Sequence, residues 1–519
     1  VYSRMLVYIS QCFNNDKAKK LSNINNLSKN EIIEGLIIKD NGYRAYQGIL
    51  EFKKIEENML ISSLTSIFGE LKNLNNIILG KTLCRSLYNL CKFHFEVFNY
   101  IKNFDYLVNE LSNLMNVHIN NKIILFYLCN VMRIIIKDGK PKFFDKHLTN
   151  LLKAFMNYAY SPGSYSTDYN ITNYCFYLSG RLIVNCEETD GNKEIIRLFY
   201  ERIYELFQES LTKEFSNKEE KECFQNGLID ITSSCVGEKK KIDMDENQVK
   251  CVFDLIDTCL KQRGSLFEEA IYAIGSLSFL DINSFKCILE RALNYVLYAI
   301  EQKSNMMLCY QGLIAADDFI RNVGEKVIVI IPKIINKIRV LLTDDEIPRG
   351  LKIKSFMIYT DIFMIEDKSI GDYTDEALKL LTNSMNNSIE PPKKEDDNDY
   401  KEYCNDLREQ SVELLSAMYV YLGGQNQINI LSNYVDGFIK YLDRIVQPEF
   451  EIKTELISEI CGLLSDIYYN YKSQMHLYLS KNSLSIIMNK LKNNENYTEE
   501  YEMGKRNLRD LIEYHGIEI

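Results

Sequence analysis

Five carboxylates in one stretch of this sequence are spaced so that they could present a continuous negative charge to a partner. Asp399, Glu402, Asp406, Glu409 and Glu413 are three, four, three and four residues apart. At 100° per residue, this spacing places all five on one face of a helix. Like charges four residues apart cost about 0.2–0.5 kcal/mol per pair, which a basic partner would relieve. These residues therefore suit the binding of a positively charged protein segment.

The same stretch carries an apolar face that must position the acids. Four apolar residues recur at helical spacing: Tyr403, Leu407, Leu414 and Met418. The apolar stripe is widened by Cys404, Leu415 and Leu422. The acidic face lies about 130° from the centre of this apolar stripe. The sequence thus predicts a helix over 399–422 that packs one side on a protein core and offers charge on the other.

Further acids fall in other expected helices and could extend the face into a groove. Glu268, Glu269, Asp318 and Glu455 each lie in the second helix of a helix pair. Second helices line the concave side of a repeat solenoid, so their charges would add up there. We take these four residues and the 399–413 acids as candidates for binding an adaptor or a cargo. A solvated helix face remains the alternative interpretation.

Three aspartates lie in otherwise apolar runs, where a structural role is expected. Asp317 and Asp361 are 44 residues apart, and Asp466 lies 105 residues further on. A carboxylate at such a position can accept backbone N–H bonds from the helix start of the next repeat, forming a ladder along the stack. We favour this ladder over cargo contact for Asp361 and Asp466, whereas Asp318 fits either role.

No set of residues with catalytic spacing stands out. The five histidines are scattered: His94, His118, His147, His476 and His515. None lies in an HExxH or nucleophile motif. Cys91 and His94 could meet on one helix face, but no second Cys/His pair stands near enough to complete a zinc site. We expect a protein that is not an enzyme and that carries no metal and no cofactor.

Composition narrows the class of partner. The 519 residues carry a formal net charge of -11, which disfavours nucleic acid and favours basic proteins or peptides. The 14 cysteines include no CxxC pair, and residues such as Cys251, Cys259 and Cys461 lie in apolar helical patterns. We interpret the cysteines as reduced core residues of an intracellular protein. No apolar run reaches the roughly 18 residues of a membrane span, and no secretory signal pattern is present.

The elements that would position these residues form a repeat. Amphipathic helices fill the first 200 residues, and no stretch of notable length alternates with period two, so no strands are expected. From about Asp245, helix pairs follow one another: 247–262 with 265–280, 283–301 with 305–323, 332–342 with 349–366, 372–387 with 400–422, 430–446 with 452–471, and 474–492 with 499–515. A period of about 40–47 residues built from two antiparallel helices is typical of HEAT or armadillo repeats.

The sequence therefore predicts an all-α fold, a right-handed α-α superhelix of HEAT/armadillo-type repeats. We expect one continuous solenoid over 1–519, with about twelve helix pairs at about 44 residues each. Pro332 is expected in the first turn of a helix, where proline is tolerated. Residues 389–399 contain two prolines and five acids, and we expect an acidic insertion there.

Several segments carry a resemblance to a known family. The segment 263–270, Arg-Gly-Ser-Leu-Phe-Glu-Glu-Ala, resembles the start of a second helix in the C-terminal half of importin-β. Segments 313–319, 358–362 and 462–467 resemble the Gly-Leu-x-Gly-Asp-type repeat cores of that family, and each contains one of the three aspartates. The most specific is 399–409, Asp-Tyr-Lys-Glu-Tyr-Cys-Asn-Asp-Leu-Arg-Glu, which is similar to the family's run Asp-x-x-x-Tyr-x-Asn-(Glu/Asp)-Leu-Arg-Glu.

This resemblance implies a nuclear import receptor that shuttles between cytoplasm and nucleus through the nuclear pore. It implies binding of an importin-α-type adaptor or a basic cargo protein, regulation by the Ran GTPase and contacts with Phe-Gly nucleoporins. It implies no membrane and no direct nucleic-acid partner. Two departures matter. The family also lines its groove with Trp, whereas this chain has none and offers 35 Tyr for stacking on Arg. We also expect the chain to begin after the family's N-terminal repeats, which leaves at most a partial Ran site.

A HEAT-repeat scaffold of another class is the alternative, such as a phosphatase regulatory subunit or a vesicle-coat component. A scaffold should use inter-repeat loops and mixed charge, whereas a transport receptor should show a continuous acidic concave face. The acidic helix at 399–413 favours the transport receptor.

Overall fold

The computed structural model is built from helices. It describes residues 2–21, 29–51, 55–74, 76–159, 169–215, 217–237, 242–261, 266–344, 346–389, 398–450 and 452–517. No β-strand occurs in these ranges, as the sequence predicted. None of the helices described there is both long and apolar enough to cross a bilayer.

The chain divides into two compact units, Val1–Ile288 and Leu289–Ile519, called unit 1 and unit 2 below. Unit 1 contains α1 (Tyr2–Asn14), α2 (Asp16–Lys20), α3 (Lys29–Leu50), α4 (Glu57–Lys72), α5 (Ile77–Phe93), η2 (Phe95–Asn99), α6 (Ile101–Val117), α7 (Lys122–Asp138), η3 (Pro141–Phe143), α8 (Leu148–Ala159), α9 (Tyr169–Asn185), α10 (Asp190–Thr212), α11 (Lys218–Val236), α12 (Glu246–Lys261), α13 (Leu266–Leu277) and α14 (Ile282–Phe285).

Unit 2 contains α15 (Leu289–Ile300), α16 (Met306–Asn322), η4 (Gly324–Lys326), α17 (Val327–Thr343), α18 (Arg349–Phe363), η5 (Lys368–Tyr373), α19 (Thr374–Ile389), α20 (Asn398–Gly424), η6 (Ile428–Asn433), α21 (Val435–Ile445), η7 (Pro448–Phe450), α22 (Thr454–Tyr478), α23 (Lys481–Lys492), η8 (Glu495–Tyr497), α24 (Thr498–Asn507) and α25 (Arg509–His515). The prediction of a single continuous solenoid stays a prediction.

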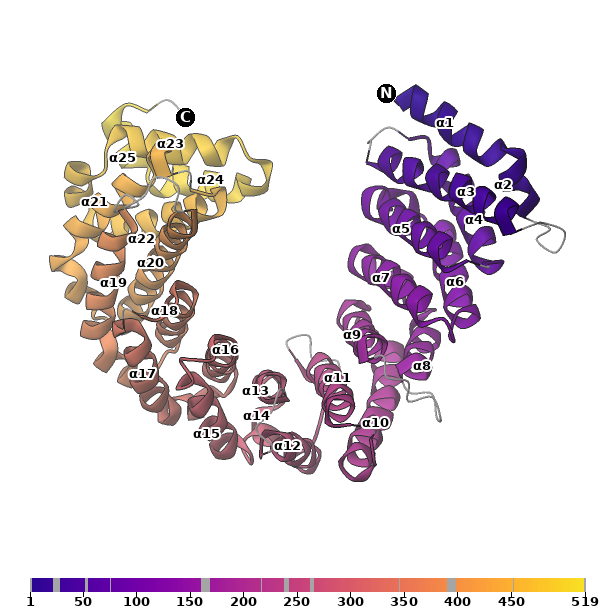
Figure 1. The fold of residues 1–519 in the computed structure, drawn as a ribbon. Coiled ribbons are helices and arrows are strands. Elements are labelled where there is room, and N and C mark those ends of the chain that lie inside the picture. The colour runs from indigo at the N-terminus through magenta and orange to yellow at the C-terminus, as the bar shows by residue number, and fades with distance from the viewer. Residues whose placement is uncertain are drawn as a thin grey trace. The chain divides into compact units, whose positions relative to one another are not determined.

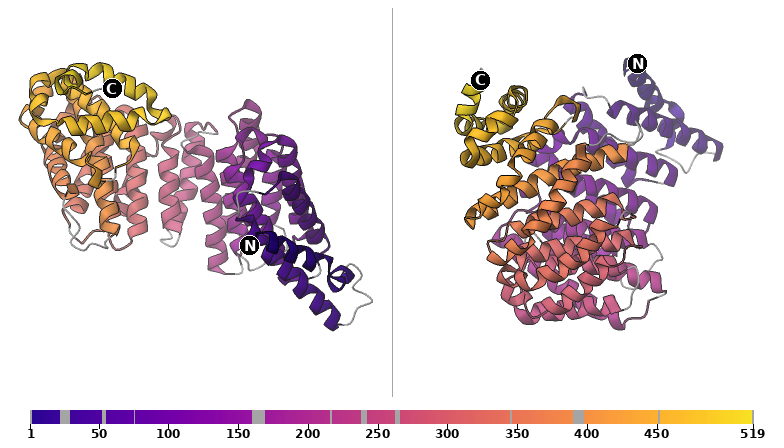
Figure 2. Two further views of the ribbon diagram at one scale, coloured as in Figure 1. Left: turned by 90° about the horizontal axis from the view of Figure 1, so that it is seen from above. Right: turned by 90° about the vertical axis from the view of Figure 1, so that its left-hand side faces the viewer.

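Each unit is a stack of helix pairs in two layers (Figure 1). In the first layer of unit 1, α3, α5, α7, α9, α11 and α13 pack on one another in that order, and α4, α6, α8, α10 and α12 cover them. In unit 2, the first layer is α16, α18, α20, α22 and α24, covered by α15, α17, α19, α21 and α23. Figure 2 shows from two further sides that the helices of each unit lie beside their neighbours in the stack.

Local sequence explains where many of these helices begin and which face they bury. Asn76 caps α5 by accepting hydrogen bonds from the backbone N–H groups of Ile78 at 2.9 Å and Leu79 at 3.1 Å. Asn121 caps α7 in the same way. The Asn-rich composition thus supplies helix starts as well as loops. Apolar residues three and four apart, such as the fully buried Leu128 of α7, then line the interior between the layers.

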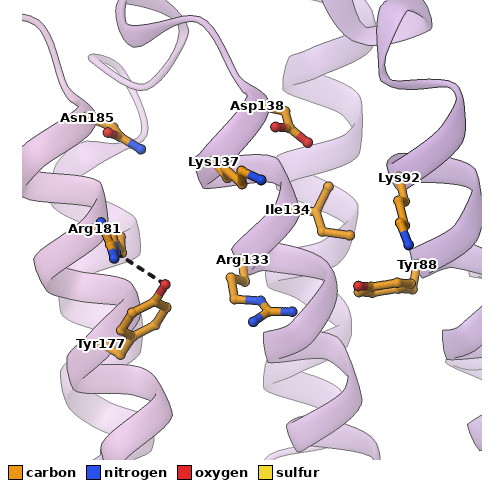
Figure 3. A pocket seen from close by; sticks show the side chains of 9 residues that line it. All are labelled: Tyr88, Lys92, Arg133, Ile134, Lys137, Asp138, Tyr177, Arg181 and Asn185. Carbon is orange, nitrogen blue, oxygen red and sulfur yellow. Dashed lines mark hydrogen bonds between the residues drawn. The ribbon is translucent and has the colours of Figure 1, made fainter. Parts of the chain in front are cut away.

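The first layer of unit 1 leaves a cavity of about 540 Å³ where α5, α7 and α9 adjoin (Figure 3). Long polar and charged side chains line this cavity, although the same helices bury leucine and isoleucine on their other faces. The stacked helices therefore expose a chemically distinct surface on this side of unit 1.

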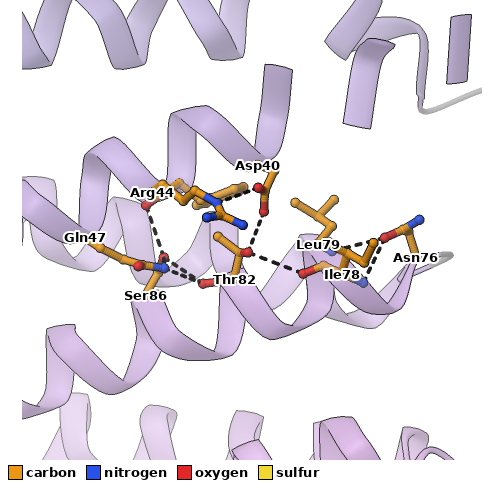
Figure 4. A network of polar contacts seen from close by, with 9 residues as sticks. Asp40, Arg44, Gln47, Asn76, Ile78, Leu79, Thr82 and Ser86 are labelled. Carbon is orange, nitrogen blue, oxygen red and sulfur yellow. Dashed lines mark hydrogen bonds and ion pairs between the residues drawn. The ribbon is translucent and has the colours of Figure 1, made fainter. Parts of the chain in front are cut away.

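Hydrogen bonds between neighbouring repeats tie the stack together. Between α3 and α5, Thr82 donates to Asp40 at 2.5 Å, and the Gln47 amide donates to the Ser86 hydroxyl at 3.1 Å (Figure 4). Arg44 holds the second carboxylate oxygen of Asp40 at 2.6 Å. These inter-helix partners are 42 and 39 residues apart, close to the 44-residue period expected from the sequence.

The predicted helix pairs from 247 onwards are found in the expected order, with several differences. The predicted helix 283–301 is divided into α14 and α15, and the predicted helix 499–515 into α24 and α25. Pro332 was expected in the first turn, but α17 starts at Val327 and places it one turn further in. Only one backbone hydrogen bond near the helix start is lost, so the buried apolar face of α17 outweighs the defect. The break expected after 471 coincides with a kink at Tyr471, but the predicted helix 474–492 is divided, because α22 ends at Tyr478 and α23 begins at Lys481. The insertion at 389–399 lies largely outside the described residues, which resume at Asn398.

Candidate functional site

The predicted acidic helix exists as α20, which packs between α18 and α22 and against α19. Its predicted apolar face is buried: Leu407, Leu414, Met418 and Leu422 are at most 5% exposed. Burying an aliphatic side chain of this kind contributes about 1.5–3 kcal/mol. The apolar contacts therefore fix the rotation of α20 and determine which side its acids face.

The five acids of α20 follow a gradient of exposure. Asp399 and Glu402 are exposed in the first turns, whereas Asp406, Glu409 and Glu413 are half-buried further along. Burial, followed by the charges of Glu402 and Glu409, raises the pKa of Asp406 above its ordinary value. The deeper end of this face thus holds negative charge at an energetic cost.

Packing of α22 beside α20 brings a further acid, the exposed Glu459, next to Glu409 and Glu413. Partial desolvation of its carboxyl, followed by the charges of Glu413 and Glu409, raises the pKa of Glu459 to about 7. Burial, and then Glu409, also raises the pKa of Glu413, although Gln410 donates a hydrogen bond to it at 2.8 Å. Cations also act on these acids: the Nζ of Lys453 lies 3.7 Å from Glu409, and the charge of Arg321 acts to lower the pKa of Glu413. We call Glu409, Glu413 and Glu459 the acidic cluster.

Glu459 was not among the candidates drawn from the sequence. Glu455 was, and the structure places it exposed in the first turn of α22. Glu459 follows Glu455 by four residues and therefore shares its helix face. That spacing was the available signal, but its significance depends on the position of α22 beside α20.

Two of the three aspartates expected to form a ladder, Asp317 and Asp361, link neighbouring helices of the layer through a different kind of partner. Asp317 of α16 is 3% exposed and accepts from Lys354 of α18 at 2.7 Å. Arg321 of α16 reaches Asp361 of α18 at 2.9 Å and Asp317 at 3.4 Å. These carboxylates thus pair with lysine and arginine side chains, whereas backbone N–H groups were expected as their partners. The reason is the side-by-side packing of α16 and α18, which brings long basic side chains to these carboxylates.

Opposite pKa shifts mark these two carboxyls. Burial acts to raise the pKa of Asp317, but the hydrogen bond with Asp361 and the charge of Lys354 hold it below its ordinary value. Burial, followed by the same hydrogen bond, raises the pKa of Asp361 to about 7. Asp361 is therefore the more readily protonated of these two carboxyls.

The remaining candidates are more scattered. Asp466 is exposed on α22, and its backbone carbonyl, rather than its carboxylate, accepts a hydrogen bond from the Tyr419 hydroxyl at 2.7 Å. Asp318 is half-buried on α16. Glu268 and Glu269 are half-buried in the first turn of α13 and belong to unit 1, whereas the other candidates belong to unit 2.

Tyrosine takes part in cation–π stacking near the acidic helix. The Arg349 guanidinium of α18 lies 5.0 Å from the ring centroid of Tyr400 and 5.7 Å from that of Tyr403. The two rings start α20 and lie 6.4 Å apart. The chain's own arginine thus shows the kind of stacking that Tyr can offer in place of Trp.

A cavity of about 470 Å³ opens between α19 and α21 of unit 2. Met385 and Ile389 line it from α19, and Phe438 lines it from α21 with Tyr434, the residue before that helix. Tyr434 is 40% exposed, and its ring stacks on that of Phe438 with centroids 6.0 Å apart. The cavity suits an aromatic side chain of a partner.

The histidines and cysteines of the described residues show structural contacts. His94 bonds through Nε2 to the backbone carbonyl of Leu50 at 2.8 Å, and burial raises the pKa of the Cys91 thiol. Among the described residues, no group of three His, Cys, Asp or Glu could hold a metal ion.

All fourteen cysteines are free thiols and eleven are buried, but Cys251 is exposed, so its assignment to the core is wrong. Cys251 lies on the solvent side of α12, whose buried face runs through Val252, Phe253 and Ile256.

These features define an α-helical repeat protein with separate charged and apolar surfaces. A family model described as "Importin subunit beta-1-like, TPR repeats" matches residues 164–492, more than half of the chain. The chain therefore belongs to the importin-β family. No protein of curated function matches it by sequence.

Solved structures agree on the fold. A structure of importin β superposes with a TM-score of 0.79 at 13% identity, covering 98% of this chain and 60% of that chain. The Kap95:Nup1 complex gives 0.77 at 11% identity, covering 98% and 57%. Kap121p bound to Pho4p gives 0.62 at 12% identity, covering 99% and 50%. The chain thus spans about 60% or less of these relatives and shares their HEAT-repeat fold.

Proposed function

We propose that this chain is an importin-β-like transport receptor that binds a basic segment of an importin-α-type adaptor or cargo on the α20–α22 face of unit 2. The acidic cluster is the observation that carries the proposal. Besides desolvation, the charge of Glu409 raises the pKa of both Glu413 and Glu459, and the charge of Glu413 also raises that of Glu459, so a bound Lys or Arg would favour their ionised forms. An arrangement that is unfavourable in the free protein and favourable in a complex is characteristic of a binding site.

Exposure along α20 supports the same proposal. The outer acids Asp399 and Glu402 would attract a basic segment from solvent, since exposed charges act over about 8–10 Å at physiological ionic strength. The acidic cluster would then pair with the segment where water is partly excluded. The family match does not support the alternative of a scaffold from another class.

Passage through the nuclear pore and release by Ran complete the proposal. The cavity between α19 and α21 would accept a Phe side chain of a Phe-Gly nucleoporin, because it is lined by Met385, Ile389 and three aromatic rings. This cavity lies between α19 and α21, the helices that pack on α20 and α22. The two partners would therefore occupy different helix layers and could bind together. The Ran site proposed for this chain is partial at most, so GTP-loaded Ran, added to a preformed receptor–peptide complex, should displace the basic peptide only poorly.

Removing charge from the acidic cluster tests the proposal directly. A double variant, Glu409→Gln with Glu459→Gln, should weaken binding of a labelled Arg/Lys-rich helical peptide by about tenfold, because charge-assisted pairs are lost. Fluorescence anisotropy measures the effect, which should shrink as salt rises.

The matched control changes two exposed acids elsewhere in unit 2. Asp372→Asn with Asp375→Asn removes the same charge from η5 and α19, away from the acidic cluster. We expect less than about a twofold change in affinity. Equal weakening by both double variants would show that only net charge matters, and the proposed site would be rejected.

A further inference from the structure

We propose that the first layer of unit 1 holds a second binding site, for an acidic peptide segment of a partner protein. The site is the cavity between α5, α7 and α9, and it carries the opposite charge to the α20–α22 face. Its lining includes four cations and one acid: Lys92, Arg133, Lys137 and Arg181, with Asp138. The lining therefore has a net charge of three positive units within a chain whose net charge is -11.

The cations occupy equivalent positions in three successive repeats. Lys92, Lys137 and Arg181 are 45 and 44 residues apart. Tyr88, Arg133 and Tyr177, one turn earlier on the same helices, show the same two separations. This register produces one row of cations and a parallel row of two tyrosines and an arginine across adjoining helices (Figure 3).

The row is bounded on its α11 side. Asp230 and Ser234 of α11 line the next cavity together with Arg181. The carboxylate of Asp230 therefore offsets part of the charge of Arg181 and limits the basic surface to α5, α7 and α9. Arg181 is also held by Tyr177, whose hydroxyl accepts from its Nε at 3.2 Å (Figure 3). Arg133 and Lys137 of α7 are thus the central cations.

These four cations differ from others in unit 1. In the part of the chain that the structure describes, none of them forms an ion pair, whereas Lys39 pairs with Glu70 at 2.6 Å and Lys72 with Glu110 at 2.5 Å. Their places in the helices do not explain this cluster fully. Lys92 and Lys137 lie in last turns, where cations offset the helix dipole, but Arg133 and Arg181 lie a turn earlier.

The geometry favours an extended peptide over other anions. Packed helices lie about 8–10 Å apart, and an extended chain advances about 3.3 Å per residue. Carboxylates three residues apart would therefore meet cations on successive helices, with arginine able to bind in bidentate fashion. The tyrosines add hydroxyl groups for backbone contacts. Cations on three helices are few for binding a nucleic acid. The rest of the chain is acidic and would repel a long polyanion.

The test uses the full 519-residue chain and a labelled 13-residue Gly/Ser peptide with Glu at every third position. Arg133→Glu and Lys137→Glu should each weaken binding by about tenfold or more. Lys153→Glu is the matched control, since Lys153 is an exposed cation of α8 and the charge change is the same. It should change the affinity by less than about twofold.

Circular dichroism should show unchanged helicity, because the substituted side chains are exposed. Should a glutamate variant lose helicity, Lys137→Gln provides the same comparison at lower risk. The proposal is overturned if Lys153→Glu weakens binding as much as Lys137→Glu does. It is also overturned if a peptide with Gln in place of Glu binds equally well, or if an oligonucleotide of equal charge binds more tightly. The site lies in unit 1, so none of these outcomes depends on the α20–α22 face.

Discussion

Glu459 shows how one side chain can couple binding to pH. Its pKa of about 7 lies above that of an unperturbed glutamate because of partial desolvation and the charges of Glu413 and Glu409. The folded protein therefore holds a proton there between about pH 4.5 and 7, and ionisation destabilises the fold as the pH rises through that range. A basic partner favours the ionised form, so its binding must release the proton.

Affinity for a histidine-free basic peptide should accordingly fall by about tenfold from pH 8 to pH 6. Anisotropy titrations across this range would measure the fall. In Glu459→Gln the group cannot ionise, so the pH dependence should flatten. An unchanged pH profile in this variant would assign the effect to another group and contradict the role given to Glu459.

Residues on one helix were predictable, and residues brought together by packing were not. The spacing of Asp399, Glu402 and Glu409 determines a shared face before any tertiary contact forms. Glu459 joins that face only because α22 packs on α20. The lysine partner of Asp317 likewise lies 37 residues away, on the next helix of the layer, and no local pattern identifies it.

At the scale of helices, α9 and α11 approach each other closely at Gly227. A Cβ built on Gly227 would lie 2.0 Å from Cδ2 of Phe176, whose ring is fully buried against Phe224. Gly227→Ala should therefore lower the free energy of unfolding by about 1–3 kcal/mol, measured by urea denaturation.

The control is Gly69→Ala in α4, where an added Cβ meets nothing within 4 Å. Alanine is the better helix former, so this variant should be neutral or more stable by up to about 1 kcal/mol. If both variants behave alike, helix propensity rather than the α9–α11 contact governs the result.

The cavity between α19 and α21 permits a similar comparison. Gly437 lines it, and an added Cβ there meets nothing within 4 Å. Gly437→Leu should fill the space and weaken binding of a Phe-Gly peptide by about tenfold or more, since burial of an aromatic ring is lost. Calorimetric titration would measure this, with Gly423→Leu in α20 as a matched open position. Normal binding to Gly437→Leu would place the Phe-Gly site elsewhere.

The helices could be predicted because Asn caps are local signals for helix starts. The 44-residue period then indicated how the helices are paired. The position of Pro332 was predicted wrongly, because the extension of α17 ahead of the proline depends on packing that outweighs local propensity. A proline within α17 and a kink within α22 are tolerated where the apolar face of the helix is already buried by its neighbours.

At the scale of the whole chain, two compact units predict unfolding in more than one step. Stability in a repeat protein is a sum over repeats and their nearest-neighbour interfaces, so the units need not unfold together. Scanning calorimetry should resolve at least two transitions, and Gly227→Ala should lower the midpoint of only one. A single transition that shifts as a whole in this variant would show that the two units unfold cooperatively.

The hydrogen bonds between neighbouring repeats also have a mechanical consequence. Thr82 reaches back 42 residues, Tyr174 reaches back 44 and Tyr419 reaches forward 47, so each tie spans one repeat. A force applied at the two termini would be carried by these hydrogen bonds one after another, and each interface between repeats would extend slightly. The chain would then stretch under tension as an elastic element, yielding first at its weakest interface and recoiling as the interfaces close again.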